Sequence, residues 1–456
     1  MADSKEDPNA EQRAQLERIR AAPGEGMNLS NLTQLDIRFQ GLSEVPKEVC
    51  LCTQLYKLDM GCNKISNLPK ELVQLKALRI LFLTSNAFTQ IPKVLCEMKD
   101  LRMLSLMRNQ IQTMDCNDLP AKIQWLIMTD NNIGEIKNFG RLSCVRKLML
   151  SHNHLDQIPD DIKDCESLQM IRLANNKFES IPKSLFTAPN LAWLAISGNP
   201  ITRKLVEGAS GKMSESTTID YETLEFGDAL GEGSGGKVRN AMWKKEMKKV
   251  AVKEYRGSRF SDGTAKDEWL LNRSLPKHDN VLVSLGSFSE PHLGLVLPLM
   301  ENATSVGGPP SLDSCTRDTH PRDMQNTQFY STQYVTKVAL AVCNGARLLH
   351  SRCIAHGDIY LHNTLHNPSG SIKLSDFGAA FHYPKELSAE VEGLEVRSFG
   401  FLILDLLKFS QVKEKPDETT RSQLKSIANS CTKSGDPKLT GKFADLCEKL
   451  EALIDQ

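Results

Sequence analysis

The sequence of 456 residues lacks several features that would each assign it to a particular class of protein. It has no net charge, because 56 Lys and Arg residues balance 56 Asp and Glu residues, so nothing favours nucleic acid or an anionic membrane as its main partner. No run approaches about 20 consecutive apolar residues, which predicts no membrane-spanning helix. The first residues, MADSKEDPNAEQR, are too polar for a signal peptide. The 12 cysteines form no CxxC pairs, which argues against a disulfide or zinc scaffold and favours a reducing, cytoplasmic location.

Asparagines recur through the first half at steps of 22 or 23 residues. Each closes one pattern: apolar, two variable, apolar, one variable, apolar, two variable, Asn. The seven are Asn63, Asn86, Asn109, Asn131, Asn153, Asn176 and Asn199. A fixed period of this kind indicates stacked units, each with a short strand whose apolar side chains join one continuous core. The asparagine side chain would satisfy backbone groups of the adjoining turns.

This pattern resembles the leucine-rich repeat family over residues 27–205, with a degenerate unit that has Gln40 in the Asn place. The resemblance implies an α/β leucine-rich repeat solenoid of seven to eight units. Residues 1–26 are expected to form a polar N-terminal segment with a cap helix. The short polar stretch 206–223 is expected to be a linker.

Variable positions between the core leucines should point to the concave face, because successive strand residues alternate sides. Two such rows contain many apolar residues, which favours a protein partner or substrate on this face. The alternative is that these side chains cover one another or pack against the second half of the chain. The rows are Lys57, Ile80, Met103, Trp125, Lys147, Met170 and Trp193, and Asp59, Phe82, Ser105, Ile127, Met149, Arg172 and Ala195.

A glycine-rich segment, LGEGSGGKV, opens the second half with G-x-G-x-x-G-x-V spacing between two strand-like segments. Glycines there let backbone N–H groups approach phosphate oxygens. Lys253 ends the apolar segment VAVK and is placed to reach the α- and β-phosphates of a nucleotide. Its expected partner is Glu268, with Asp267 as the competing choice, and Met300 follows a buried strand where an adenine would sit. The predicted nucleotide-binding residues are Gly231, Glu232, Gly233, Ser234, Gly235, Gly236, Val238, Ala251, Lys253 and Met300.

Three further side chains occur in the order that phosphoryl transfer needs. HGDIYLHN contains Asp358 and Asn363, and SDFG contains Asp376. A carboxylate must orient the acceptor hydroxyl, and oxygen ligands must hold Mg²⁺ on the phosphates. We assign the first task to Asp358 and the metal to Asn363 and Asp376.

In this order, the motifs resemble the protein-kinase superfamily over residues 224–456. The resemblance implies an α+β two-lobed, kinase-like domain with ATP and Mg²⁺ between the lobes, in which Asp358, Lys253 and Glu268 are catalytic. It also implies a protein kinase, with Ser/Thr or dual specificity, whose repeats recruit partners or substrates. The combination is similar to a group of leucine-rich-repeat kinase-like proteins with an abridged kinase domain.

Several positions depart from the protein-kinase pattern. Gly357 stands where an arginine usually precedes the catalytic aspartate, and Tyr360 where a lysine usually points to the γ-phosphate. Only 16 residues separate Gly378 from Glu395, which stands in place of an aspartate, and no Ala-Pro-Glu motif occurs. Two alternatives therefore stay open: a pseudokinase and repeat scaffold for protein interactions, or a small-molecule phosphotransferase, whose catalytic loop is also written HGD followed by Asn.

Overall fold

The computed structural model describes residues 9–25, 29–210, 217–233, 235–257, 259–260, 262–321, 330–411 and 415–454. The chain divides into two compact units, residues 1–168 and residues 169–456. The last two repeat strands thus lie in the second unit. The expected linker at 206–223 stays a prediction, and its residues 211–216 fall outside the described part. Within the described part, no helix is long and apolar enough to cross a membrane.

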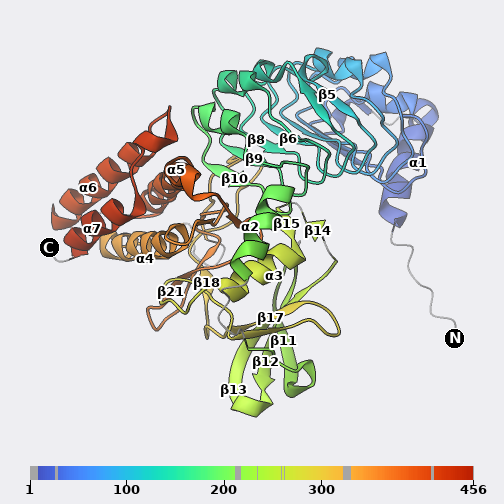
Figure 1. Ribbon diagram of the computed structural model, residues 1–456. Coiled ribbons are helices and arrows are strands. Elements are labelled where there is room, and N and C mark those ends of the chain that lie inside the picture. The colour runs from blue at the N-terminus through green and yellow to red at the C-terminus, as the bar shows by residue number, and fades with distance from the viewer. Residues whose placement is uncertain are drawn as a thin grey trace. The chain divides into compact units, whose positions relative to one another are not determined.

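Short parallel strands, one per repeat, build the first unit (Figure 1). The middle residue of each strand, such as Leu58 or Leu104, is fully buried because its side chain points into the stack. Short 3₁₀ helices form the return segments, for example Lys70–Gln74 and Lys93–Glu97. The strands are β1 (Gln34–Asp36), β2 (Lys57–Asp59), β3 (Ile80–Phe82), β4 (Met103–Ser105), β6 (Trp125–Ile127) and β8 (Lys147–Met149), while β5 (Thr113–Asp115) pairs with β7 (Glu135–Lys137).

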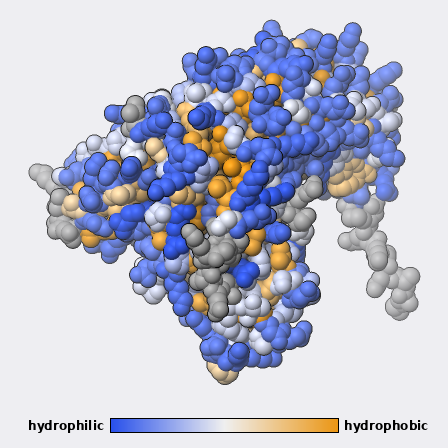
Figure 2. All heavy atoms as spheres, in the orientation of Figure 1, coloured by the Kyte–Doolittle hydropathy of each residue, from blue (hydrophilic) through white to orange (hydrophobic). Residues whose placement is uncertain are grey.

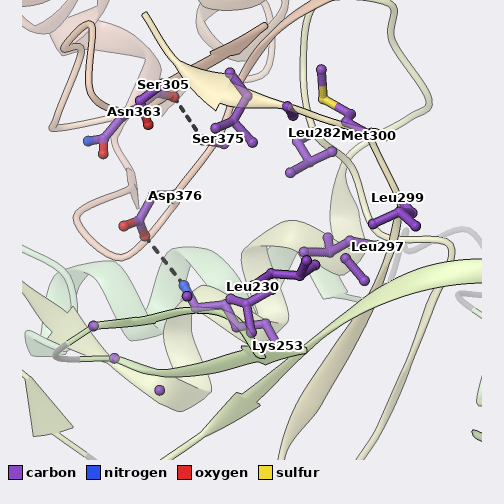
Figure 3. Close-up of a pocket in the computed structure, with 18 of the residues that line it drawn as sticks. Leu230, Lys253, Leu282, Leu297, Leu299, Met300, Ser305, Asn363, Ser375 and Asp376 are labelled. Carbon is purple, nitrogen blue, oxygen red and sulfur yellow. Dashed lines mark hydrogen bonds and ion pairs between the residues drawn. The ribbon is translucent and has the colours of Figure 1, made fainter. Parts of the chain in front are cut away.

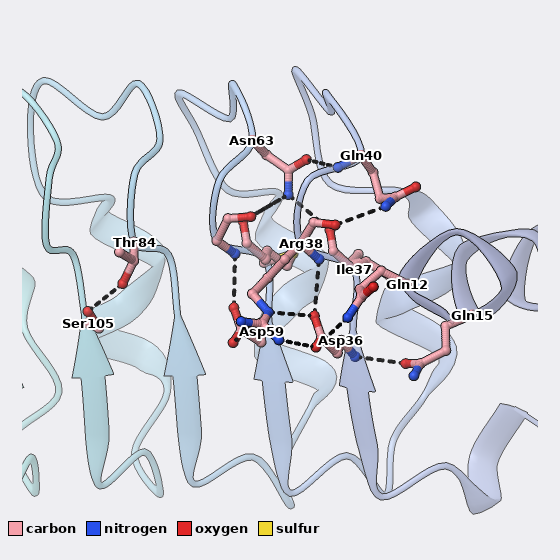
Figure 4. Close-up of polar contacts among 12 residues, drawn as sticks. Gln12, Gln15, Asp36, Ile37, Arg38, Gln40, Asp59, Asn63, Thr84 and Ser105 are labelled. Atoms are coloured by element: carbon pink, nitrogen blue, oxygen red, sulfur yellow. Dashed lines mark hydrogen bonds and ion pairs between the residues drawn. The ribbon is translucent and has the colours of Figure 1, made fainter. Parts of the chain in front are cut away.

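The repeated asparagines hold successive turns together, as expected. Asn63 Nδ2 donates to the carbonyl oxygens of Ile37 and Met60, and its Oδ1 accepts from the backbone N–H of Gln40 (Figure 4). With the N–H of Leu42 and the carbonyl oxygen of Gly61, one side chain therefore bonds five backbone groups of two neighbouring repeats, which no purely apolar residue could do.

Helix α1 (Ala10–Glu25) covers the N-terminal end of the first unit. Its Leu16 and Ile19 are buried, and Gln15 Oε1 accepts from the backbone N–H of Asp36 on the edge strand β1 (Figure 4). The helix thus satisfies a backbone group at an edge that the repeats would otherwise leave open.

The second unit begins with the parallel strands β9 (Met170–Arg172) and β10 (Trp193–Ala195), followed by helix α2 (Pro200–Ser210). Asn199 continues the asparagine pattern, since its Nδ2 donates to the carbonyl oxygen of Leu173 and its Oδ1 accepts from the N–H of Asn176. Both strands are buried along their length.

After the repeats come an antiparallel sheet and a group of helices, the two-lobed α+β architecture expected from the sequence (Figure 1). The sheet has the order β11 (Leu224–Gly233), β12 (Gly236–Trp243), β13 (Lys248–Tyr255), β17 (Gly294–Pro298), β16 (Gly286–Phe288), and α3 (Ala265–Ser274) follows the small pair β14 (Arg259–Phe260) and β15 (Gly263–Thr264). The helical lobe contains α4 (Thr332–His350), α5 (Ser388–Lys408), α6 (Lys415–Cys431) and α7 (Phe443–Ile454), with β18 (Thr304–Ser305), β19 (Ile354–Ala355), β20 (Thr364–His366), β21 (Ile372–Leu374) and β22 (Phe381–His382).

An apolar core joins the four large helices of the second lobe. It includes Val338 of α4, Phe399 of α5, Leu424 of α6 and Phe443 of α7, all fully buried. Outside this core, hydrophilic residues cover most of the face seen in Figure 2, as on most folded proteins. Ile359 and Leu361, in the segment between β19 and β20 that contains HGDIYLHN, belong to the same core.

Candidate active site

A pocket of about 920 Å³ lies between the sheet and the helical lobe of the second unit. Leu297, Leu299 and Met300 line one end and Asn363 and Asp376 the other (Figure 3), so the pocket has an apolar and a polar end. Of the predicted nucleotide-binding residues, the following line it: Gly231, Glu232, Gly233, Gly235, Gly236, Val238, Ala251, Lys253 and Met300. Ser234 lies outside the described residues.

The glycine-rich segment forms the hairpin between β11 and β12, with Gly233 opposite Gly236. Gly236 has φ +152°, and a Cβ there would lie 2.1 Å from the carbonyl oxygen of Glu254 on β13. Only glycine can therefore bring this hairpin so close to the next strand. Gly231, Gly233, Gly235 and Gly236 of this segment line the pocket.

Lys253 is the centre of a charged group at the polar end. Its Nζ lies 2.5 Å from Glu268 Oε1 and 3.4 Å from Asp376 Oδ1. Strand β13 supplies the lysine and α3 the glutamate, whereas Asp267 accepts a hydrogen bond from Thr264 Oγ1 and helps to begin α3. The partner of Lys253 is thus Glu268, and not the competing Asp267.

The electrostatics of this group favour the charged forms of Lys253 and Asp376. Burial alone would lower the pKa of Lys253, but the carboxylates of Asp376 and Glu268 outweigh it and raise that pKa. Lys253 in turn lowers the pKa of Asp376. Burial raises the pKa of Glu268, and Lys253 partly opposes this. A charged lysine next to an ionised aspartate suits the binding of a metal–phosphate group.

The catalytic loop places Asp358 beside Asn363. Asn363 Nδ2 donates to the backbone carbonyl oxygen of Asp358 at 3.0 Å and to its Oδ2 at 2.9 Å. Asn363 lines the pocket and Asp358 does not. The two side chains are hydrogen-bonded to each other, and Asn363 is the one that reaches the pocket.

Glu395, which looked from the sequence like a departure from the family, holds this loop in place. Its Oε2 accepts from the N–H of His356 at 3.1 Å and its Oε1 from the N–H of Gly357 at 2.6 Å, while His350 Nε2 lies 2.8 Å from Oε2. The carboxylate is buried, and these partners outweigh burial and lower its pKa. Sequence reasoning missed this role, although a buried acidic residue in the apolar helix α5 was a usable signal.

The repeat strands bring two residues to the catalytic loop that sequence analysis had placed on a surface for partners. Arg172 Nη2 lies 2.5 Å from Asp358 Oδ1, and the indole N–H of Trp193 donates to the carbonyl oxygen of Ile359 at 3.2 Å. Both side chains are almost fully buried. The expectation that these two positions offer a free concave surface is therefore wrong, and packing against the chain's own second half is correct for them.

Magnesium fits the donor atoms at the polar end. Asp376 offers a carboxylate whose side chain is 58% exposed, and Asn363 offers an amide oxygen because its nitrogen is turned to Asp358. Oxygen atoms of this kind are the ligands that Mg²⁺ prefers, and the remaining positions are usually filled by water and phosphate. When bound, Mg²⁺ would neutralise charge on the phosphates.

Comparison with known proteins assigns both halves. Residues 224–396 match the protein kinase domain family, and residues 30–88, 53–111 and 143–201 match the leucine rich repeat family. The chain is 26% identical over 53% of its length to a seven transmembrane domain-containing tyrosine-protein kinase of Dictyostelium discoideum. It is 34% identical over 40% of its length to mouse mitogen-activated protein kinase kinase kinase 5, and 28% identical over 50% to kinase suppressor of Ras A of Caenorhabditis elegans.

The chain spans 38%, 13% and 27% of the lengths of these three relatives. Their similarity therefore concerns one part of each relative. Together with the pocket and the repeat strands, the family matches show that this chain joins leucine-rich repeats to a protein kinase domain.

Proposed function

We propose that the chain is an ATP- and Mg²⁺-dependent protein kinase that acts on Ser or Thr residues and whose repeats recruit a partner or substrate. The observation that carries the proposal is the contact of Lys253 with both Glu268 and Asp376 at the polar end of the pocket. A fixed cation beside a carboxylate that could hold Mg²⁺ supports the proposal, because phosphoryl transfer needs both at the nucleotide phosphates.

The assigned roles follow from the contacts. Lys253, held by Glu268, would bind the α- and β-phosphates, and Asn363 and Asp376 would hold Mg²⁺. The apolar end with Met300 would receive the adenine. Asp358 would orient the acceptor hydroxyl, since it is an ionisable carboxylate joined to the metal-binding Asn363 by a hydrogen bond.

Acceptor class and location are further parts of the proposal. The names of the relatives include a tyrosine-protein kinase and a mitogen-activated protein kinase kinase kinase, so the names alone do not decide between acceptors. We assign Ser/Thr from the HGDIYLHN and SDFG motifs, and a cytoplasmic location from the 12 cysteines, which are scattered along the sequence without CxxC spacing. A protein partner would use the concave positions of the first unit.

A pseudokinase scaffold is the second candidate, and one observation favours it. Both carboxylate oxygens of Asp358 already accept hydrogen bonds, Oδ1 from Arg172 and Oδ2 from Asn363. An enzyme would use the remaining lone pairs of these oxygens. A scaffold would bind nucleotide without turnover.

The deciding experiment measures phosphate transfer from ATP to a generic protein substrate with the full chain and Mg²⁺. Lys253→Met should abolish transfer, because the phosphates lose their cation and Glu268 its partner. Lys248→Met is the matched control, since Lys248 is an exposed residue of the same strand β13. Equal transfer by Lys253→Met and the intact chain would reject the proposed site, and Mg·ATP binding without transfer in the intact chain would favour the scaffold.

A further inference from the structure

Arg172 makes three polar contacts at the catalytic loop. Its Nη1 donates to the carbonyl oxygen of Gly357 at 2.9 Å, its Nη2 lies 2.5 Å from Asp358 Oδ1, and its Nε lies 2.9 Å from Asp262 Oδ1. The planar guanidinium group suits this work, because its donors point in fixed directions. Arg172 therefore fixes one edge of the Asp358 carboxylate while Asn363 fixes the other.

The contact with the repeat strands also explains two unusual residues of the catalytic loop, Gly357 and Tyr360. Gly357 has φ +74°, and a Cβ there would lie 2.8 Å from the carbonyl oxygen of Leu194 in β10 and 2.5 Å from that of Ala379. Tyr360 stacks on Trp193 with 4.7 Å between ring centroids and 3° between planes. An arginine at 357 would collide with the repeat strand, and a lysine at 360 would lose the stacking.

The contact between the last two repeat strands and the catalytic loop lies in the interior of the second unit and not at its surface. Arg172 and Trp193 are almost fully buried, and Arg397 of α5 donates to the carbonyl oxygen of Leu191 at 2.5 Å. Separating β9 and β10 from the loop would expose these groups and break the buried ion pair of Arg172 with Asp358, which is costly. The catalytic loop and the last two repeats thus form one packed structure.

We propose that Arg172 is a positioning residue for the reaction, so that the last two repeats complete the catalytic site. Arg172 holds the Asp358 carboxylate at Oδ1, and Asn363 holds it at Oδ2. These two fixed donors set the orientation of the carboxylate and therefore the direction of its remaining lone pairs. The cationic partner of Asp358 therefore comes from a repeat strand, β9. This inference rests on the proposed kinase function.

The test compares Arg172→Met, Arg172→Lys and the control Arg203→Met in the full chain. Arg203 is exposed on α2 and bonds Asn175. For Arg172→Met we expect kcat to fall about 100-fold, the effect of losing reactant orientation, whereas the KM and Kd for Mg·ATP stay within about twofold because Arg172 does not line the pocket. Arg172→Lys should lie between, since lysine keeps the charge but not the fork of donors. Arg203→Met should match the intact chain.

Each outcome of these measurements either supports or overturns the role of Arg172. Unchanged kcat in Arg172→Met overturns the inference, raised kcat shows that Arg172 blocks Asp358, and a parallel loss of Mg·ATP binding shows a merely structural role. If Arg172→Met does not fold, Arg172→Lys decides alone: lower kcat with unchanged Kd supports the inference, and unchanged kcat overturns it. An active intact chain with an equally active Arg172→Met refutes only the inference, whereas an intact chain that binds Mg·ATP without transfer refutes the proposed function and the inference with it.

Discussion

Trp193 of the repeats lies flat on Tyr360 of the catalytic loop, with the two rings 3° from parallel and their centroids 4.7 Å apart. Phe401 of α5 stacks near the same indole at 5.4 Å. Aromatic stacking adds about 0.5–1.5 kcal/mol to the free energy gained by burial. The indole therefore joins a repeat strand, the catalytic loop and a helix of the kinase domain.

Trp193→Ala should lower the free energy of unfolding of the second unit by about 3–5 kcal/mol, because it removes a large buried side chain. Trp193→Phe should cost less, since it keeps a stacked ring and loses the hydrogen bond to Ile359. Urea unfolding followed by circular dichroism measures both. Equal unfolding midpoints for Trp193→Ala and the intact chain would show that the stacking does not stabilise the fold.

Asp358 and Asp376 should fail in different ways when each is changed to asparagine. Asp358→Asn should greatly reduce transfer and leave Mg·ATP binding nearly intact, because Asp358 is not among the residues that line the pocket. Asp376→Asn should weaken binding in the presence of Mg²⁺, because it removes a metal ligand and a partner of Lys253. Nucleotide titrations with and without Mg²⁺ separate the two, and identical binding defects would contradict the division of roles.

Phosphatase treatment should leave activity unchanged. A phosphate on the segment after Asp376 would need a cationic partner, and position 357, where protein kinases usually have an arginine, is a glycine. The guanidinium of Arg172 is not available either, because it pairs with Asp262 and Asp358. Transfer rates of the purified chain before and after treatment measure this. Loss of transfer after dephosphorylation would require another phosphate receptor.

Restoring the usual kinase residue at position 357 should harm the protein. Gly357→Arg, and also Gly357→Ala, place a Cβ against the carbonyl oxygens of Leu194 and Ala379 at a positive φ. We expect lower stability, by at least about 1 kcal/mol, and lower kcat. Gly370→Ala is the control, because Gly370 also has a positive φ but open space around the Cβ position. Similar losses at both positions would mean that backbone strain, and not the repeat strand, requires glycine.

His382 should make the second unit less stable in acid. Burial lowers the pKa of His382 from its ordinary 6.5 to about 4. The unfolded chain therefore binds a proton at a higher pH than the folded chain, so the stability contributed by neutral His382 is full above about pH 6.5 and falls toward pH 4, by about 1.4 kcal/mol per pH unit.

His382→Phe should reduce this dependence, and His154→Gln, a change of an exposed histidine, should not. Urea midpoints between pH 7 and pH 4 give the comparison, and parallel curves for His382→Phe and the intact chain would contradict the assignment.

The sequence predicted most of the architecture because the relevant signals are local and periodic. The asparagine repeat predicted the strands and their core leucines. The motifs and their spacing predicted a shared site for Lys253, Glu268, Asn363 and Asp376, and all four line one pocket. Contacts between distant segments leave no such signal. Asp267 remained a competing partner for Lys253 beside the expected Glu268, because the sequence leaves the register of α3 open by one residue. The pairing of Arg172 with Asp358 joins residues 186 positions apart.

The same limit explains why the sequence predicts Trp193 on a concave face for a protein partner. Strand alternation predicts which side of the repeat a side chain faces, and it does not predict what covers that side. Gly357 and Tyr360 looked like losses of kinase residues for the same reason. They are the residues that accommodate β10.

Repeat arrays commonly gain and lose whole units during evolution, because each unit contacts only its neighbours. In this chain, the tolerance for gain or loss of a unit differs along the array. Loss of one 23-residue unit around Asn86 would leave β9 and β10 with all their contacts to the kinase domain. Loss of the unit that contains Arg172, or insertion of one between β9 and β10, would separate Arg172 from Trp193 and deprive the catalytic loop of one of them. We therefore expect homologous chains to differ in repeat number on the N-terminal side of Gln169 and to keep the last two units unchanged.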